Sequence, residues 1–205
     1  MKPNMFFDTI KEYFEENDVY LGDLDIDNVD FEYEFFLNGE DSPFRFYHGA
    51  TRGCFMPLYK SDYVFKFDFD NLQNSYCFRE SEIYAIAEQY NLGFAFAKIK
   101  CFDEIDNTRI YLQEKVYRYS DSLKQHSVEE LKSIRDKTSN YHENTWMIPP
   151  EWSLAFVDTY GEEVFDEFLE FCVEQNINDL TESNIGYTKE GLPIAFDFAG
   201  YHELS

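Results

Sequence analysis

The sequence has 205 residues, and its 41 Asp and Glu outnumber its 17 Lys and Arg, for a net charge of -24. Nucleic-acid backbones and anionic membranes attract cationic surfaces, so we expect no direct binding to nucleic acid or to a membrane. Aromatic residues make up 20% of the chain, which is typical of a folded domain with a large core and not of a disordered acidic tail.

Several features of the sequence predict a cytoplasmic protein. No stretch approaches the roughly 20 apolar residues of a membrane span. The N-terminal segment carries early acidic residues in place of the apolar core of a signal peptide. The cysteines at positions 54, 77, 101 and 172 are isolated and show no zinc-binding spacing, so we expect buried, reduced thiols.

The first half of the chain predicts a helix followed by an antiparallel sheet. Residues 4–17 place apolar side chains at helical spacing. Between residues 19 and 69, short aromatic runs are separated by turn residues; the runs are VDFEYEFFL, FRFYHG, GCFMPLY and YVFKFDF. Residues 75–90 indicate a second helix. Two further strands, FAFAKIKCF and RIYLQEKV, are predicted on either side of the turn DEIDN.

The second half is predicted to be mainly helical. The segment SVEELKSIRDKT has the Ser and Glu spacing of a capping box at a helix start. Pro149-Pro150 precedes a long helical stretch, and the last segment predicts a hairpin with strands IGYT and PIAFDF. The predicted fold class is α+β. Residues 1–117 would form a strand-rich domain with an N-terminal helix and one inward helix, and residues 118–205 a reduced helical domain with a hairpin.

The C-terminal segment carries the most specific chemical pattern. Asp179-Leu180 is followed by three variable residues and Asn184, which is the spacing of the protein-kinase catalytic loop. Asp197-Phe198-Ala199-Gly200 follows 13 residues after Asn184 and resembles the Asp-Phe-Gly metal-binding motif. Phosphoryl transfer uses an Asp to position the attacking hydroxyl, and an Asn with a second Asp to hold Mg²⁺ against the phosphates of ATP.

A lysine and a glutamate upstream fit the same pattern. Val64-Phe65-Lys66-Phe67 resembles the kinase strand whose Lys reaches the α- and β-phosphates of ATP. In the next predicted helix, Glu80 shares a face with Ile83 and Ala87 and would point inward toward Lys66. Glu82 is the alternative partner of Lys66.

Two more segments resemble nucleotide-binding parts of a kinase. Gly49, Thr51 and Gly53 lie between two predicted strands, where a loop that covers the phosphates belongs. The segment Leu112–Val116 is similar to a kinase hinge. In that comparison the carbonyl of Glu114 and the amide of Val116 would face adenine, and Gln113 would be the gatekeeper.

Taken together and in this order, the motifs resemble the protein-kinase-like superfamily, especially small divergent bacterial and bacteriophage kinase-like proteins. The resemblance implies a bilobal fold with an antiparallel-sheet N-lobe, a truncated helical C-lobe, and ATP and Mg²⁺ in the cleft. It assigns Lys66 to the phosphates, Glu80 to the orientation of Lys66, Asp179 to the acceptor hydroxyl, and Asn184 and Asp197 to the metal.

The sequence also departs from the kinase pattern. The predicted phosphate loop has two glycines and not three, and Ile177-Asn178 replaces the His-Arg that precedes the catalytic Asp. The sequence ends at residue 205, eight residues after Asp197, so we expect no activation loop. We therefore expect Mg-ATP binding with weak or absent phosphotransferase activity, as in a kinase-like enzyme or a pseudokinase.

A second function is compatible with the charge of the chain. A compact acidic protein can bind a basic protein partner as an inhibitor, an immunity protein or a DNA mimic, and residues 22–34 are a candidate face. A pseudokinase scaffold can serve the same purpose. Taken alone, Lys66 is also compatible with a solvent-facing lysine of an alternating strand, and Glu80 with a solvated helix acid.

Overall fold

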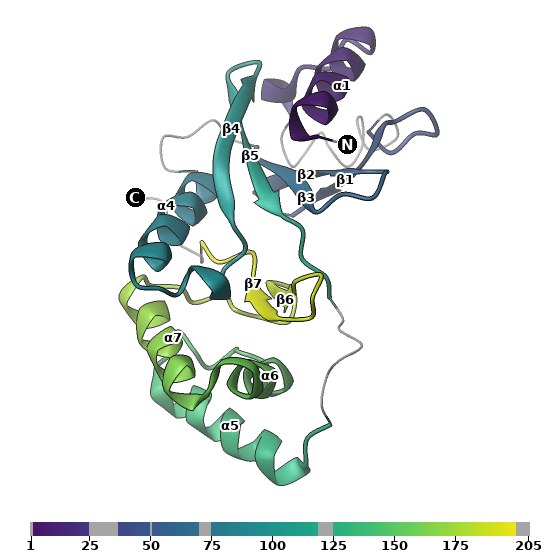
Figure 1. The fold of residues 1–205 in the computed structure, drawn as a ribbon. Coiled ribbons are helices and arrows are strands. Elements are labelled where there is room, and N and C mark those ends of the chain that lie inside the picture. The colour runs from purple at the N-terminus through teal and green to yellow at the C-terminus, as the bar shows by residue number, and fades with distance from the viewer. Residues whose placement is uncertain (1, 25–36, 50, 70–74, 119–124, 200–205) are drawn as a thin grey trace. The chain divides into compact units, whose positions relative to one another are not determined.

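A computed structural model describes residues 2–24, 37–49, 51–69, 75–118 and 125–199 (Figure 1). The chain divides into two compact units. Unit 1 comprises Met1–Ser81 and Ile99–Lys115, and unit 2 comprises Glu82–Lys98 and Val116–Ser205. Residues 82–98 thus belong to the unit that contains the C-terminal part of the chain and not, as the sequence predicts, to the domain formed by residues 1–117.

Unit 1 is built on an antiparallel sheet with the strand order β1-β2-β3-β5-β4. The five strands are β1 (Phe44–His48), β2 (Arg52–Pro57), β3 (Tyr63–Asp68), β4 (Ile99–Ile105) and β5 (Thr108–Glu114). Helix α1 (Pro3–Glu16) and the short turn η1 (Leu21–Asp23) precede the sheet, and helix α4 (Tyr76–Gln89) follows β3. These elements confirm the predicted helices and the antiparallel sheet. The predicted strand VDFEYEFFL lies outside the described residues except for Leu37.

One face of this sheet carries an aromatic core, because alternate residues of a strand point to the same side. The rings come from α1 and three strands: Phe6, Phe7, Phe14, Phe44, Phe46, Phe55, Phe65 and Phe67. The ring centroids of Phe6 and Phe65 are 5.7 Å apart, and those of Phe14 and Phe55 are 5.6 Å apart. Much of the aromatic content of unit 1 is therefore used to pack α1 onto the sheet.

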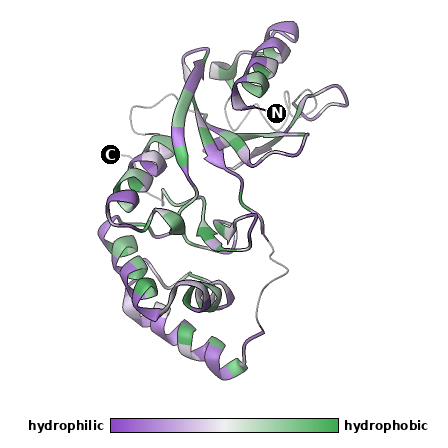
Figure 2. Ribbon diagram, in the orientation of Figure 1, coloured by the Kyte–Doolittle hydropathy of each residue, from purple (hydrophilic) through white to green (hydrophobic). Residues whose placement is uncertain are grey.

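Unit 2 is mainly helical, with α5 (Val128–Tyr141), α6 (Pro150–Tyr160), α7 (Glu162–Glu174), the short turn η3 (Gly93–Ala95), and the hairpin strands β6 (Ile185–Tyr187) and β7 (Pro193–Ala195). Figure 2 shows hydrophilic and hydrophobic residues mixed along α5, α6 and α7. In α7 the buried residues are Phe165, Phe168, Leu169, Phe171 and Cys172, as expected for an amphipathic helix. No helix among the described residues has the length and apolarity needed to cross a membrane.

Capping residues and a glycine determine where the helices of unit 2 begin and end. The capping box predicted at Ser127 is present: its hydroxyl accepts from the Glu130 N–H at 3.2 Å, and the Glu130 carboxylate accepts from the Ser127 N–H at 2.8 Å. The long helical stretch predicted after Pro149-Pro150 is instead two helices. Gly161 separates them with a φ of 96°, a backbone conformation that residues other than glycine rarely adopt.

The β4–β5 hairpin differs from its predicted bounds. Strand β4 begins at Ile99, because Gly93–Ala95 form η3, and it continues to Ile105. The turn is therefore the pair Asp106-Asn107 and not the whole segment DEIDN. Both residues have positive φ, 50° and 65°, as the tightest hairpin turns require. The pairing with β5 also shifts between Cys101 and Asp103, which marks a bulge in β4.

The prediction of four buried thiols is only half correct. All four cysteines are free, and Cys77 and Cys172 are buried. Cys101 is exposed because β4 is an edge strand with solvent on much of its surface, and Cys54 has intermediate exposure. Burial raises the pKa of the Cys77 and Cys172 thiols well above their ordinary value, which keeps both thiols protonated.

The hairpin β6–β7 is held against other parts of unit 2 at Gly186. The indole N–H of Trp152 donates to the Gly186 carbonyl at 3.0 Å. Tyr117 and Tyr187 exchange two backbone hydrogen bonds of 2.8 and 2.7 Å. A Cβ on Gly186 would lie 2.6 Å from the Tyr117 carbonyl oxygen, so this close approach of two backbones requires glycine.

Gly186→Ala is therefore expected to lower the free energy of unfolding by about 1–3 kcal/mol, because the added methyl group must displace backbone. Urea unfolding would measure the change. Gly49→Ala is the matched control, since nothing lies within 4 Å of the position that its Cβ would take. Equal stability of the two variants would contradict the packing described for Gly186.

Candidate functional site

The most distinctive polar feature of unit 1 is a buried ion pair. The Lys66 ammonium lies 2.8 Å from one carboxylate oxygen of Glu80 and 3.1 Å from the other. The Glu80 side chain has no solvent exposure, and that of Lys66 is 8% exposed. Glu82, the alternative partner, is exposed to solvent. The contact expected between Lys66 and Glu80 is thus present.

The local sequence explains why these two side chains meet. In β3, Phe65 and Phe67 face the aromatic core, so Lys66 points to the opposite face of the sheet. In α4, Glu80 precedes Ile83 and Ala87 at helical spacing, and all three are buried. Strand alternation and helix periodicity together place the lysine and the glutamate against each other.

Arg52 is a second cation on Glu80 that the sequence analysis did not assign. Its Nη1 donates to Glu80 Oε1 at 2.8 Å, and its guanidinium lies 5.1 Å from the centroid of the Tyr76 ring. Arg52 begins β2 and stands in register opposite Asp68 of β3. Alternation along β2 and β3 is the signal that places Arg52, Lys66 and Asp68 on one face.

Asp68 links the sheet to the start of α4. Both of its carboxylate oxygens accept from the Cys77 N–H at 3.3 Å, while the Ser75 hydroxyl accepts from the Phe78 N–H at 3.0 Å. Burial raises the pKa of the Asp68 carboxyl, and hydrogen bonds from Ser75 and Cys77 and the positive charge of Arg52 oppose this rise. These contacts satisfy backbone donors at the helix N-terminus, which fixes where α4 begins.

The predicted phosphate loop is a tight connection between β1 and β2. The Gly49 N–H donates to the Arg52 carbonyl at 2.9 Å, and the Thr51 carbonyl accepts from the Phe69 N–H at 3.0 Å. Gly53 is buried, and a Cβ there would clash with the rings of Phe67 and Phe46. Aromatic packing is therefore sufficient to require glycine at position 53.

The predicted hinge, Leu112–Val116, comprises the last three residues of β5 and the two residues that follow. Glu114 is paired with Tyr63, and Gln113 is buried in register opposite Val64. Unit 1 ends at Lys115, so Glu114 belongs to unit 1 and Val116 to unit 2.

In unit 2, the structure brings Asp179 and Asn184 together. The side-chain amide of Asn184 donates to Asp179 Oδ2 at 2.8 Å and to the Asp179 carbonyl at 2.7 Å. The Asn184 carbonyl in turn accepts from the N–H groups of Phe196 at 3.0 Å and Asp197 at 3.4 Å. The three residues predicted from the C-terminal motifs are therefore neighbours in one hydrogen-bonded loop and hairpin.

The end of α7 positions this loop. Asn176 has a φ of 54°, and its N–H donates to the Val173 carbonyl at 3.1 Å. The next residue, Ile177, donates to the Cys172 carbonyl at 2.7 Å. This pair of bonds is a Schellman motif, which ends the helix and turns the chain toward Asp179.

Asn184 and Asp197 offer an amide oxygen and a carboxylate, the oxygen ligands that Mg²⁺ prefers. Asn184 is 8% exposed, and its Oδ1 accepts from the Ser183 hydroxyl at 3.1 Å. The part of the chain that the structure describes contains no group of three or more His, Cys, Asp or Glu that would hold a metal ion. The donor set suits a Mg²⁺ ion that also takes phosphate and water oxygens, which is how proteins usually bind it.

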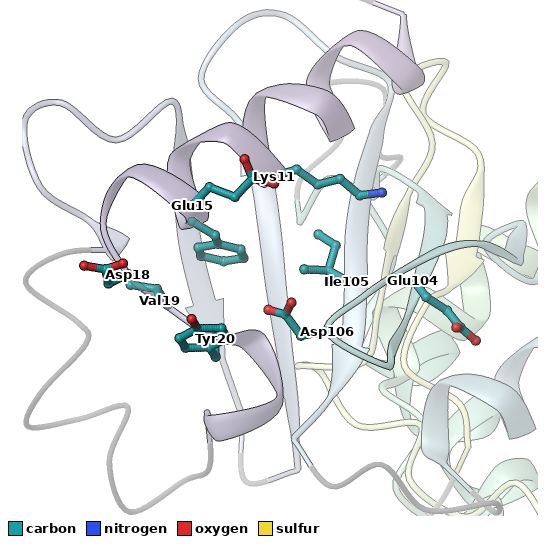
Figure 3. Close-up of a pocket in the computed structure, with 9 residues that line it drawn as sticks. Lys11, Glu15, Asp18, Val19, Tyr20, Glu104, Ile105 and Asp106 are labelled. Atoms are coloured by element: carbon teal, nitrogen blue, oxygen red, sulfur yellow. The ribbon is translucent and has the colours of Figure 1, made fainter.

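A hollow of about 390 Å³ lies elsewhere in unit 1, beside α1 and the β4–β5 turn (Figure 3). It is lined by Lys11, Phe14, Glu15, Asp18, Val19, Tyr20, Glu104, Ile105 and Asp106. Asp106 has a structural role there, because its carboxylate accepts from the Leu21 N–H at 3.1 Å. Four carboxylates against one ammonium make the hollow unsuitable for a phosphate group, and it contains none of the predicted site residues.

No protein-family model matches this chain, and neither a curated protein nor a solved structure matches it.

The ion network predicts different effects for two acids of α4. Glu80→Ala is expected to lower the free energy of unfolding by about 3–5 kcal/mol, because it leaves the buried Lys66 and the partly exposed Arg52 without their counter-charge. Glu82→Ala, an exposed position on the same helix, is the control and should change it by about 0.5 kcal/mol or less. Urea unfolding of both variants tests this, and equal effects would contradict the geometry.

Proposed function

We propose that the chain is a kinase-like protein that binds Mg-ATP and has weak or absent phosphotransferase activity. The observation that supports this most is the buried pair of Lys66 and Glu80. Lysine is rarely fully buried unless it is paired, and a buried ion pair often adds no more stability than apolar residues of similar volume would. Among the described residues, Lys66 is the single buried lysine or arginine.

Unit 1 would bind the phosphates. The Lys66 ammonium would contact them, and Glu80 would hold it in position. Gly49, Thr51 and Gly53, in the connection between β1 and β2 and at the start of β2, would form the segment that covers the phosphates. A sheet whose third strand carries the lysine, followed by a helix that carries its glutamate, is compatible with this function. A kinase-like bilobal fold is part of the proposal, with unit 1 as the sheet-containing lobe and unit 2 as the helical lobe.

Unit 2 would contribute the metal-binding and acceptor-binding residues. Asn184 and Asp197 would hold Mg²⁺, and Asp179 would accept a hydrogen bond from the hydroxyl that is to be phosphorylated. Bound Mg²⁺ would neutralise phosphate charge. The carbonyl of Glu114 and the amide of Val116 would bind adenine. The hydrogen bonds from Asn184 to Asp179 support a shared role for these residues.

The charge of the chain sets a condition on nucleotide binding. ATP is a polyanion, and a protein with a net charge of -24 repels it at long range. Short-range cations must therefore supply the attraction. Lys66 and a Mg²⁺ ion carried by the nucleotide meet this need, so binding should be weaker for ATP without Mg²⁺.

A second candidate function uses the acidic surface. Helix α7 exposes Glu163, Glu167 and Glu170 to solvent, whereas its exposed Glu162 and Asp166 pair with Lys137 of α5 at 3.0 and 2.6 Å. Such a face is complementary to a basic protein partner. Most of the segment 22–34, the face suggested by the sequence, lies outside the described residues. Binding of a basic partner through α7 would survive substitution of Lys66 or Asp197, which separates the two functions.

Thermal unfolding with ATP and Mg²⁺ tests nucleotide binding. A ligand at 100 times its dissociation constant should stabilise the wild-type chain by about 2.7 kcal/mol. Lys66→Ala and Asp197→Ala should reduce this stabilisation, whereas Lys60→Ala, at an exposed lysine before β3, should retain it. The absence of any stabilisation at millimolar Mg-ATP would overturn the proposal.

Incubation with γ-labelled ATP tests phosphoryl transfer. We expect slow or undetectable labelling of the chain itself or of an added acceptor, because Ile177-Asn178 and the extra Ala199 depart from the kinase motifs around the catalytic groups. Any transfer should be lost in Asp179→Ala and kept in Glu182→Ala, an exposed position in the same loop. Rapid transfer to a protein acceptor would contradict the expectation.

A further inference from the structure

Two cations share one buried carboxylate in unit 1. Glu80 is fully buried, and it accepts from Arg52 Nη1 at 2.8 Å and from Lys66 Nζ at 2.8 and 3.1 Å. A single cation would be enough to balance the charge of one carboxylate. The presence of Arg52 therefore affects whether Lys66 can bind a second anion.

A lysine that is the sole counter-ion of a fully buried carboxylate binds a second anion at an energetic cost. If its ammonium turns toward a phosphate, the carboxylate loses part of its compensation in a medium where an unbalanced charge is costly. Arg52 lowers this cost. With Arg52 at 2.8 Å, Glu80 keeps a counter-charge even when Lys66 shares its own charge with a ligand.

Arg52 is well suited to a fixed role of this kind. The guanidinium does not lose its proton in proteins, and its planar fork suits a carboxylate better than a lysine does. Its side chain is 18% exposed, it lies over the Tyr76 ring, and its strand position is opposite Asp68. The Tyr76 ring and the Glu80 carboxylate thus hold it in place, and Asp68 adds a nearby negative charge.

We propose that Arg52 is a positioning residue that neutralises Glu80 and so leaves Lys66 able to bind the phosphates of a nucleotide. The inference rests on the proposed function, because it assumes that Lys66 binds phosphate. It assigns Arg52 an effect on affinity that acts through Glu80 and involves no contact with the nucleotide.

A double-mutant cycle between Arg52 and Glu80 tests the inference. Isothermal titration with Mg-ATP gives the dissociation constant for the wild-type chain, Arg52→Met, Glu80→Gln and the double variant. Arg52→Met should raise the dissociation constant about 10-fold when Glu80 is present, and less than about twofold in the Glu80→Gln background, because a neutral amide needs no counter-ion. Arg52→Lys, which keeps the charge, should stay close to wild type.

Thermal unfolding shows whether each variant is folded, and Arg52→Gln replaces Arg52→Met if the latter does not fold. Arg109→Met is the control, since Arg109 is exposed on β5 and pairs only loosely with Glu104, at 3.9 Å. An equal loss of affinity in both backgrounds would mean that Arg52 contacts ATP directly. No loss in either would mean that Arg52 has no such role. Both results overturn the inference while the proposed function stands, whereas failure of the wild-type chain to bind Mg-ATP overturns both.

Discussion

The buried carboxylate of Glu80 is the constraint on which the polar side of unit 1 depends. A carboxylate without solvent exposure must be paired, and here β2 and β3 each supply one cation. These two strands must therefore keep their register, since a slip of one residue would move Arg52 or Lys66 to the aromatic face. The start of α4 is tied to the same strands through Asp68, so helix and sheet are positioned by one set of charges.

The two faces of the sheet contribute differently to the stability of unit 1. Stacked phenylalanines on one face bury apolar area against α1, and this burial supplies most of the stabilisation that such a sheet can gain. The other face contributes little net stability, because the desolvation of charges offsets their attraction. A chain that needed stability alone would gain as much from apolar residues at positions 52, 66 and 80. Stability alone therefore does not account for these charges, and the proposed function assigns them a role in binding.

Much of this arrangement is predictable from the sequence, and the two features that were not predicted, the role of Arg52 and the helix break at Gly161, each have a cause in the neighbouring residues. Alternation around Lys66 and the helical spacing of Glu80, Ile83 and Ala87 predicted the faces on which the two residues lie. The contact between them was predicted only because the kinase-like motifs pair such a lysine with such a glutamate. The role of Arg52 was not predicted, because residues 49–53 resemble a phosphate-binding loop. Arg52 is in fact the first residue of β2, and because alternate residues share a face, Arg52 and Cys54 lie on the same face of the sheet as Lys66. The break at Gly161 was missed because apolar residues keep their helical spacing across it.

Edge strand β4 has a consequence for how the chain behaves at high concentration. An exposed strand edge offers unpaired backbone groups to other molecules, and an aromatic-rich protein is at particular risk of pairing there. Strand β4 carries exposed Lys100, Asp103 and Glu104, and its pairing is bulged after Cys101. Charge and bulge both disfavour the addition of a foreign strand. The charges and the bulge of β4 should therefore disfavour edge-to-edge association of two copies of the chain.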